Sequence, residues 1–107
     1  MALVKLGPGA LPALPELTAA LKDSDPNVRL MSGNAIAAIG KAAAPAVPAL
    51  IAACSVKGEQ IHVLRAYAGA LGAIGKPAAT PGLPVLKKLA EHPRIRWAAE
   101  AAIKKIQ

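Results

Sequence analysis

Apolar residues recur at intervals of three and four along most of the chain, as they do on the buried face of a helix. Two sets of this kind lie 67 residues apart: Val28, Met31, Ala35 and Ile39, followed by Ile95, Ala98, Ala102 and Ile106. No stretch alternates apolar and polar residues in the way that a half-buried strand does. The pattern therefore predicts an all-α fold.

Three glycines, each directly after an apolar residue, divide the chain into three similar units. Gly7, Gly40 and Gly75 are these glycines, at intervals of 33 and 35 residues. Each glycine is followed by a turn, a pair of prolines, an apolar helix, a polar turn and a second apolar helix. The second helix of the third unit ends the given sequence. A fixed period of roughly 20–50 residues is typical of a solenoid. We therefore expect one domain, residues 1–107, with repeats at residues 8–40, 41–75 and 76–107.

The prolines of each pair are three residues apart and are expected in the first turn of the first helix. A missing N–H costs no helical hydrogen bond at that place. The pairs are Pro12 and Pro15, Pro45 and Pro48, and Pro81 and Pro84. The glycine that closes each second helix is expected in the left-handed conformation that ends many helices.

The second helix of the first repeat carries clear start signals. Asp25 is predicted to be its N-cap and Pro26 its first residue, while Asp23 adds negative charge near the positive helix end. In the third repeat His92 takes the position of Asp25 and is a weaker cap. The middle repeat has a turn two residues longer and no proline there.

The sequence LPALPELTAALKDSDPNVRLMSGNAIAAIG, residues 11–40, resembles a HEAT repeat of the short, bacterial-style type also found in phycobilisome lyases. The resemblance rests on P-x-L in the first helix, D-x-D-P-x-V-R between the helices and A-I-A-A-I-G at the end. It extends over about three units, although the second unit has Leu64 at the position of Arg29. It implies a right-handed α-solenoid of about three helix pairs whose second helices line the concave face. It indicates the fold more than the task, since these repeats serve many functions.

Residues 3–7, LVKLG, align with the last turn of the later second helices, so we expect residues 1–7 to be the end of a preceding helix. Either the chain is a piece of a longer array or this end is capped in an unusual way. A solenoid needs polar caps at its ends. Because an exposed apolar end pairs readily with another copy, we expect a tendency to self-associate through exposed ends of the stack.

Composition limits the function further. Apolar residues make up 54% of the chain but aromatic residues only 2%, namely Tyr67 and Trp97. With so few large side chains, we expect no deep cavity for a small molecule. Because Cys54 is the single cysteine, no intrachain disulfide framework exists and no oxidising compartment is required.

No membrane segment is expected. The longest charge-free run, residues 42–56, has 15 residues with two prolines, whereas a spanning helix needs about 20 apolar residues. The prolines near the N-terminus interrupt the apolar helix that a signal peptide requires. These features predict a cytoplasmic protein.

Residues for catalysis or metal binding are sparse. Cys54 aligns with the apolar Leu21 and is expected to be buried, and the nearest histidine, His62, lies beyond the predicted turn. The DSDPN sequence begins like a calcium loop, but Val28 and Asn34 stand where that loop requires Gly and Glu. The other acids are expected at scattered surface positions: Glu16, Glu59, Glu91 and Glu100. We therefore predict no enzymatic activity, no metal site and no cofactor.

The alignment of the repeats places Leu30, Arg65 and Trp97 in one row across the second helices. Asn34 and Glu100 lie a turn further on, among small residues that would leave a shallow groove. Such a row is typical of a binding hot spot. The alternative is that Trp97 seals the C-terminal end of the stack.

Arg29 and Arg96 occupy equivalent positions in the first and third repeats. Their place in the HEAT motif implies salt bridges between repeats, and a ligand-binding role is the alternative.

The net charge of +7 favours acidic partners, nucleic acid or an anionic membrane surface. Lys41 and Lys76 each follow a closing glycine and would form a ladder along one edge, with Lys104 and Lys105 in the basic third repeat. These lysines are candidates for phosphate contacts, or they only keep an apolar repeat protein in solution. The sequence therefore predicts a non-catalytic scaffold for an acidic protein or peptide, with a nucleic-acid-binding module as the alternative.

Overall fold

A computed structural model describes residues 11–107, and in this part the chain forms α-helices and short 3-10 helices without strands. The α-helices are α2 (Leu14–Ala20), α3 (Pro26–Ile39), α4 (Val47–Cys54), α5 (Ile61–Ile74), α6 (Leu83–Leu89) and α7 (Arg96–Ile106). The 3-10 helices η2 (Gly40–Ala46) and η3 (Thr80–Gly82) join the pairs. The all-α prediction is confirmed. The predicted helix end at residues 1–7, with Gly7, lies outside the described residues.

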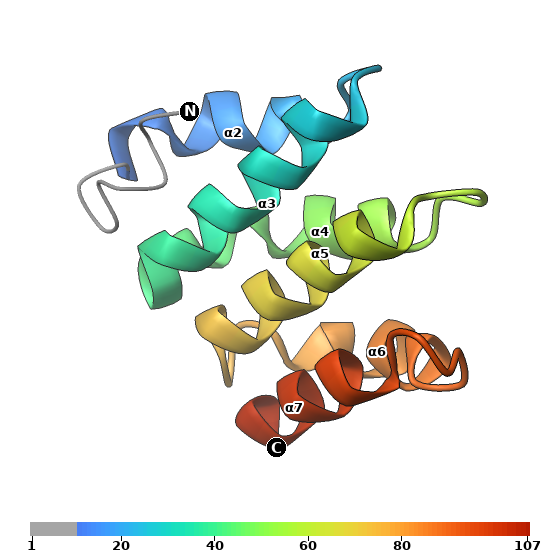
Figure 1. Cartoon of the computed structure of the whole chain (residues 1–107). Coiled ribbons are helices and arrows are strands. Elements are labelled where there is room, and N and C mark those ends of the chain that lie inside the picture. The colour runs from blue at the N-terminus through green and yellow to red at the C-terminus, as the bar shows by residue number, and fades with distance from the viewer. Residues whose placement is uncertain (1–10) are drawn as a thin grey trace.

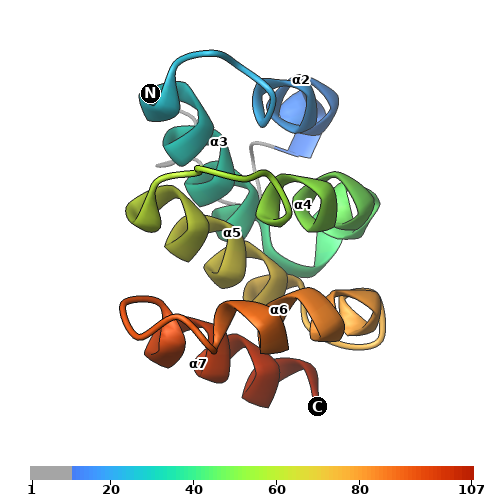
Figure 2. The same ribbon diagram turned by 90° about the vertical axis from the view of Figure 1, so that its right-hand side faces the viewer.

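The helices form two layers (Figures 1 and 2). The first helices of the pairs, α2, α4 and α6, lie side by side in one layer, and the second helices, α3, α5 and α7, lie in the other. Each pair is stacked on the next along the chain, so the molecule is an α-solenoid, as the sequence predicted. Within the second layer, α5 packs against α3 on one side and α7 on the other.

The core lies between the two layers and is filled by aliphatic side chains. The fully buried ones are Leu17, Ile36, Leu50, Leu71, Ile74, Leu86, Ile95 and Ile106, with Val63 and Tyr67. Glycines let the second helices approach one another closely. A Cβ atom on Gly33 would lie 3.2 Å from the ring of Tyr67, and one on Gly72 would lie 3.1 Å from the backbone of Ala102.

Two of the closing glycines have the positive φ that the sequence predicted, but their ψ angles of −140° and −175° lie outside the left-handed helical region that was expected. Gly40 has φ of 76° and Gly75 has φ of 70°, and each ends an α-helix of the second layer. A residue with a Cβ atom rarely adopts such angles, so glycine is the suitable residue at both places.

The proline pairs differ from the prediction. Only the second proline of each pair lies in the first turn of an α-helix, whereas Pro45 and Pro81 lie in the preceding 3-10 helices and Pro12 in a 3-10 turn at residues 11–13. The cap residue Val47 bonds to Ala44, three residues back. Pro48 then has no N–H to continue the tight turn. The α-helix consequently begins between the two prolines.

The start of α3 agrees with the prediction. Asp25 Oδ1 accepts a hydrogen bond from the N–H of Asn27 at 2.8 Å, and Asp23 Oδ1 accepts one from the N–H of Asp25 at 2.8 Å. In the third repeat, His92 Nδ1 accepts a longer bond, 3.3 Å, from the N–H of Arg94. The chain continues in turns, so α7 begins only at Arg96, and Ile95 is its N-cap residue. His92 therefore caps a turn and not the helix.

The helical stretch Pro26–Cys54 is, by length and composition, apolar enough to cross a membrane, with 29 residues and a mean hydropathy of 1.7. It is not one straight helix, because Gly40 and η2 separate α3 from α4. The two helices lie in different layers of the stack (Figure 2), where they contribute Ile36 and Leu50 to the core. Burial in the stack accounts for part of the apolar character of this stretch, since 39% of its most apolar window is buried.

Candidate interaction surface

The second helices carry the row that the sequence predicted. Leu30 on α3 is half-buried, whereas Arg65 on α5 and Trp97 on α7 are exposed. The guanidinium carbon of Arg65 lies 6.0 Å from the centre of the Trp97 ring. At about this distance a cation and an aromatic face attract one another. Arg65 and Trp97, two members of the row, therefore lie next to one another in the folded protein.

Arg65 is held in this position by the next repeat. Its Nε and Nη2 atoms donate hydrogen bonds to the backbone oxygen of Arg94, at 3.3 and 2.9 Å. Trp97 is 67% exposed, so it covers little of the core and does not seal the end of the stack. An exposed tryptophan beside a fixed arginine is a feature that partner-binding surfaces favour.

Asn34 and Glu100 lie in different surroundings. Asn34 is exposed, and its equivalents Gly69 and Ala101 are exposed small residues, so this part of the surface is shallow. Glu100 corresponds to Gly33, which faces the next repeat, so Glu100 points toward the C-terminal end of the stack. There it shares an open depression of about 710 Å³ with Trp97, Ile103, Lys104 and α6 residues.

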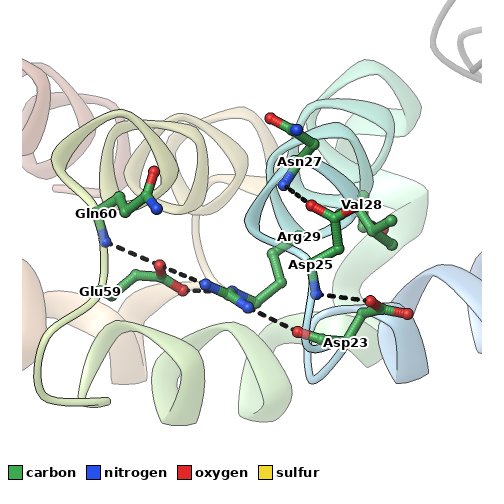
Figure 3. A network of polar contacts seen from close by, with 8 residues as sticks. Asp23, Asp25, Asn27, Val28, Arg29, Glu59 and Gln60 are labelled. Atoms are coloured by element: carbon green, nitrogen blue, oxygen red, sulfur yellow. Dashed lines mark hydrogen bonds and ion pairs between the residues drawn. The ribbon is translucent and has the colours of Figure 1, made fainter.

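Arg29 forms the inter-repeat salt bridge that the HEAT motif implied (Figure 3). Its Nε lies 2.7 Å from Glu59 Oε2, and its Nη2 donates to Glu59 Oε1 at 3.0 Å. Its Nη1 donates to the backbone oxygen of Asp23 at 2.7 Å. A two-pronged arginine–carboxylate pair is among the stronger polar contacts. Arg29 thus joins the turn of the first repeat to the turn of the second.

Arg96 does not form such a salt bridge, and the prediction is wrong for it. Its Nε donates to the backbone oxygen of Ala90 at 3.1 Å, and it has no ion pair within residues 11–107. Arg29 also bonds to the carbonyl six residues before it, so the two arginines share this contact to the end of the first helix. Arg96 lacks only the acidic partner that Glu59 provides.

Glu59 was expected at the surface, and this expectation is wrong. Its side chain is only 3% exposed, and it also accepts a hydrogen bond from the N–H of Gln60 at 2.8 Å. The hydrogen bond from Arg29 lowers the pKa of Glu59, although burial acts in the opposite direction. The same bond raises the pKa of Arg29. The longer turn of the middle repeat was the available signal that this acid had a special position.

Tyr67 lies beside this pair and is fully buried. No hydrogen bond of its hydroxyl group with a residue of 11–107 has good geometry, although the group lies near enough to Glu59 to help lower the pKa of that carboxyl. Burial, together with the negative charge of Glu59, raises the pKa of Tyr67 to about 12. The sequence gave no sign that this hydroxyl would be left without a partner.

Cys54 is buried, as expected, and burial raises the pKa of its thiol to about 12. The thiol is therefore protonated at neutral pH, and a protonated thiol is a poor nucleophile. Within the described residues, no group of three His, Cys, Asp or Glu side chains is placed to hold a metal ion.

The candidate phosphate-binding lysines are exposed near the C-terminal ends of the second helices. These ends lie along one edge of the stack (Figure 1), where the helix dipoles also favour cations. Lys41 and Lys76 follow Gly40 and Gly75, and Lys76 Nζ donates to the oxygen of Gln107 at 3.1 Å. The basic edge defined by Lys41, Lys76, Lys104 and Lys105 therefore continues onto the last turn of α7.

The helix pairs are stacked in two layers, and an arginine links the turns of successive repeats. The second helices also carry a row of exposed side chains. These features define an α-solenoid repeat protein. Residues 14–104 match the family model for HEAT repeats, so the chain belongs to the HEAT-repeat family. This family commonly mediates protein interactions. Comparison with curated proteins and with solved structures gives no match.

Proposed function

We propose that this protein is a non-catalytic scaffold that binds an acidic segment of a partner protein across its second-helix layer. The observation that carries the proposal is the exposed pair of Arg65 and Trp97, which the backbone oxygen of Arg94 holds in place. A fixed arginine and an exposed tryptophan offer an anionic, partly apolar segment both charge and contact area at low entropic cost.

The surroundings of the pair favour an extended segment. Exposed Gly69 and Ala101 leave the surface beside the pair shallow, and the basic edge lies at the C-terminal ends of the same helices. Arg94, just before α7, is also exposed. Positive charge around a shallow apolar strip attracts acidic partners and fixes how they bind.

The proposal is tested with fluorescein-labelled peptides that are rich in Asp and Glu and contain one Leu or Phe. Fluorescence anisotropy measures their binding to wild type, Arg65→Ala and Trp97→Ala. We expect each variant to lose about tenfold or more in affinity, since truncation of a hot-spot residue costs about 2 kcal/mol. Lys88→Ala is the matched control, because Lys88 is an exposed cation on α6, in the other layer. A loss in the lysine control as large as that in Arg65→Ala, with Trp97→Ala unchanged, would reduce the effect to net charge and contradict the proposal.

A second candidate function, nucleic-acid binding, is favoured by the basic edge. Lys41 and Lys76 stand at equivalent places after two closing glycines, at the ends of parallel helices. A row of cations along an edge can follow a phosphate backbone, and such binding weakens steeply with salt. The scarcity of aromatic residues argues against base stacking.

Anisotropy with labelled duplex and single-stranded DNA, at about 50 and 200 mM salt, separates the two candidates. If the basic edge binds DNA, the double change Lys41→Glu and Lys76→Glu abolishes binding. The control, Lys22→Glu with Lys57→Glu, changes the net charge by the same amount away from this edge and should leave most of the DNA binding intact. Similar losses from both pairs would show attraction by overall charge alone.

A further inference from the structure

A hollow of about 370 Å³ opens where the first two repeats meet, away from the row on the second helices. It lies between α2, α4 and the turns that join each of them to its second helix. The volume falls in the range of small-molecule sites, roughly 300–1,000 Å³. The sequence led us to expect no deep cavity, because large side chains are few. The hollow exists because the small side chains of α4 leave this volume unfilled.

The walls of the hollow are apolar. They are formed by Leu21 at the end of α2 and by α4 and the turn after it, namely Ala49, Ala52, Ala53 and Val56. Val56 stands at the rim with 59% of its surface exposed, which is unusual for a large aliphatic side chain in this protein. An occupant with an apolar body would cover these walls and the side chain of Val56.

The free charge at the mouth is positive. Lys22 and Lys57 line the hollow from the two turns and are exposed, and their side chains have no ion pair or hydrogen bond within residues 11–107. Both acids of the lining are already engaged. Asp23 Oδ1 accepts the N–H of Asp25, and Glu59 is paired with Arg29. An anion at the mouth would therefore meet two available cations.

The floor of the hollow is polar and held in place. Arg29 and Glu59 close it with their two-pronged salt bridge, and Tyr67 contributes its buried ring. The hydroxyl of Tyr67 has no partner among the described residues, which is a costly state for a buried donor. The hollow therefore combines a rigid floor, apolar walls and a cationic mouth.

We propose that this hollow binds a small organic carboxylate with a compact apolar body, such as an arylalkanoic acid. The apolar body lies against Leu21 and the alanines of α4, and the carboxylate lies between Lys22 and Lys57. A cation is disfavoured because the lining carries more positive than negative groups, and a strongly polar ligand would leave the apolar walls uncovered. This site is separate from the surface proposed for the partner protein.

The test is a titration of the isotope-labelled full chain with 3-phenylpropionate, followed by two-dimensional NMR. We expect shifts at residues that line the hollow and a dissociation constant of about a millimolar or lower, as is usual for so small a ligand. The uncharged amide of the same acid is the matched probe and should bind about fivefold or more weakly, because it cannot pair with the lysines. Equal binding of acid and amide, or shifts centred on Trp97 instead, would overturn the proposal.

Two variants locate the site. Lys22→Gln with Lys57→Gln should remove the preference for the acid over its amide, whereas Lys41→Gln with Lys76→Gln should leave it unchanged. Ala52→Leu should fill the hollow and abolish binding of both probes, and Ala52 is exposed, so the fold tolerates the larger side chain. Unaltered binding in Ala52→Leu would place the ligand elsewhere. None of these outcomes depends on whether the row at Arg65 binds a protein.

Discussion

At the scale of single residues, the contact with the largest consequences is the salt bridge between Arg29 and Glu59. It joins two turns that are 30 residues apart in the sequence, and the Glu59 side chain is nearly removed from solvent. A buried carboxylate depends on its partner, because a charge without one is costly to bury. The stability of the first two repeats should therefore respond to the ionisation of Glu59.

We predict that Glu59→Gln destabilises the protein at pH 7 and that this difference disappears in acid. The folded-state pKa of Glu59 is lowered, so its contribution is complete above the unfolded pKa, about 4.3, and is lost as the pH falls through the folded value. The loss at pH 7 should be about 1–3 kcal/mol, since Arg29 loses a charged partner. Urea unfolding of both proteins between pH 7 and pH 2 measures it. A difference that stays constant over this range would contradict the prediction.

Tyr67→Phe provides a second residue-scale test, because the hydroxyl of Tyr67 has no partner within residues 11–107. Removing it should leave the protein as stable or raise the free energy of unfolding by about 1 kcal/mol or more, since an unpaired buried hydroxyl costs about 1–3 kcal/mol. Tyr67→Ala should cost about 3–5 kcal/mol, since it empties the place of a fully buried ring. Thermal and urea unfolding compare the three proteins. A loss above about 1 kcal/mol in Tyr67→Phe would reveal a hydrogen bond to the hydroxyl.

At the scale of the elements, α5 is the helix on which the stack depends, since it packs against both α3 and α7. Its close approach to α7 requires a residue without a Cβ atom at Gly72. Three residues earlier on the same helix, Gly69 is exposed, and a Cβ atom there would meet nothing within 4 Å. Both glycines lie inside α5, but only Gly72 is packed against another helix.

We predict opposite effects for alanine at these two positions. Gly69→Ala should stabilise the protein by about 0.5–1 kcal/mol, the usual gain from replacing glycine inside a helix. Gly72→Ala should destabilise it by about 1–3 kcal/mol, because the new Cβ atom lies 3.1 Å from the backbone of Ala102 and the helices must separate. Melting temperatures of the two variants against wild type give the sign of each. If both variants are more stable than wild type, α5 and α7 can accommodate a Cβ atom at position 72, and the prediction is wrong.

At the scale of the whole molecule, the C-terminal end of the stack differs from the joints between the repeats. Gly33 and Gly72 face the next repeat, as does the buried Ala68, whereas Glu100 and Lys104 are exposed at the positions of Ala68 and Gly72 in α7. Charged side chains cannot be buried against another helix without a partner. This end is therefore unsuited to stacking, and the expected self-association through exposed ends remains a prediction for the other end.

We predict that Glu100→Ala with Lys104→Ala allows the C-terminal ends of two molecules to associate. In the double variant, α7 carries alanine at the two positions where α5 has the small residues Ala68 and Gly72. Light scattering after size exclusion, over micromolar concentrations, should show a dimer for this variant. The control pair, Lys88→Ala with Glu91→Ala, removes the same charges at exposed positions elsewhere and should not. A double variant that stays monomeric would show that charge is not what keeps this end from stacking.

Sequence alone determined the features that depend on near neighbours. The spacing of apolar residues predicted the helices, the closing glycines Gly40 and Gly75 predicted positive φ angles, and Asp25 predicted the start of α3. Helix hydrogen bonding and capping act over a few residues, and the repeat then copies them along the chain. The same reasoning placed Arg65 beside Trp97, and the guanidinium carbon of Arg65 lies 6.0 Å from the centre of the Trp97 ring.

Only the tertiary structure decided what distant segments do to one another. It buried Glu59 against Arg29, left the hydroxyl of Tyr67 without a partner, delayed the start of α7 to Arg96 and opened a hollow between α2 and α4. These outcomes depend on the distance between two turns and two helices, which differs between repeats because their turns differ in length. Side-chain periodicity carries no information about such distances, since they are fixed only when the repeats pack.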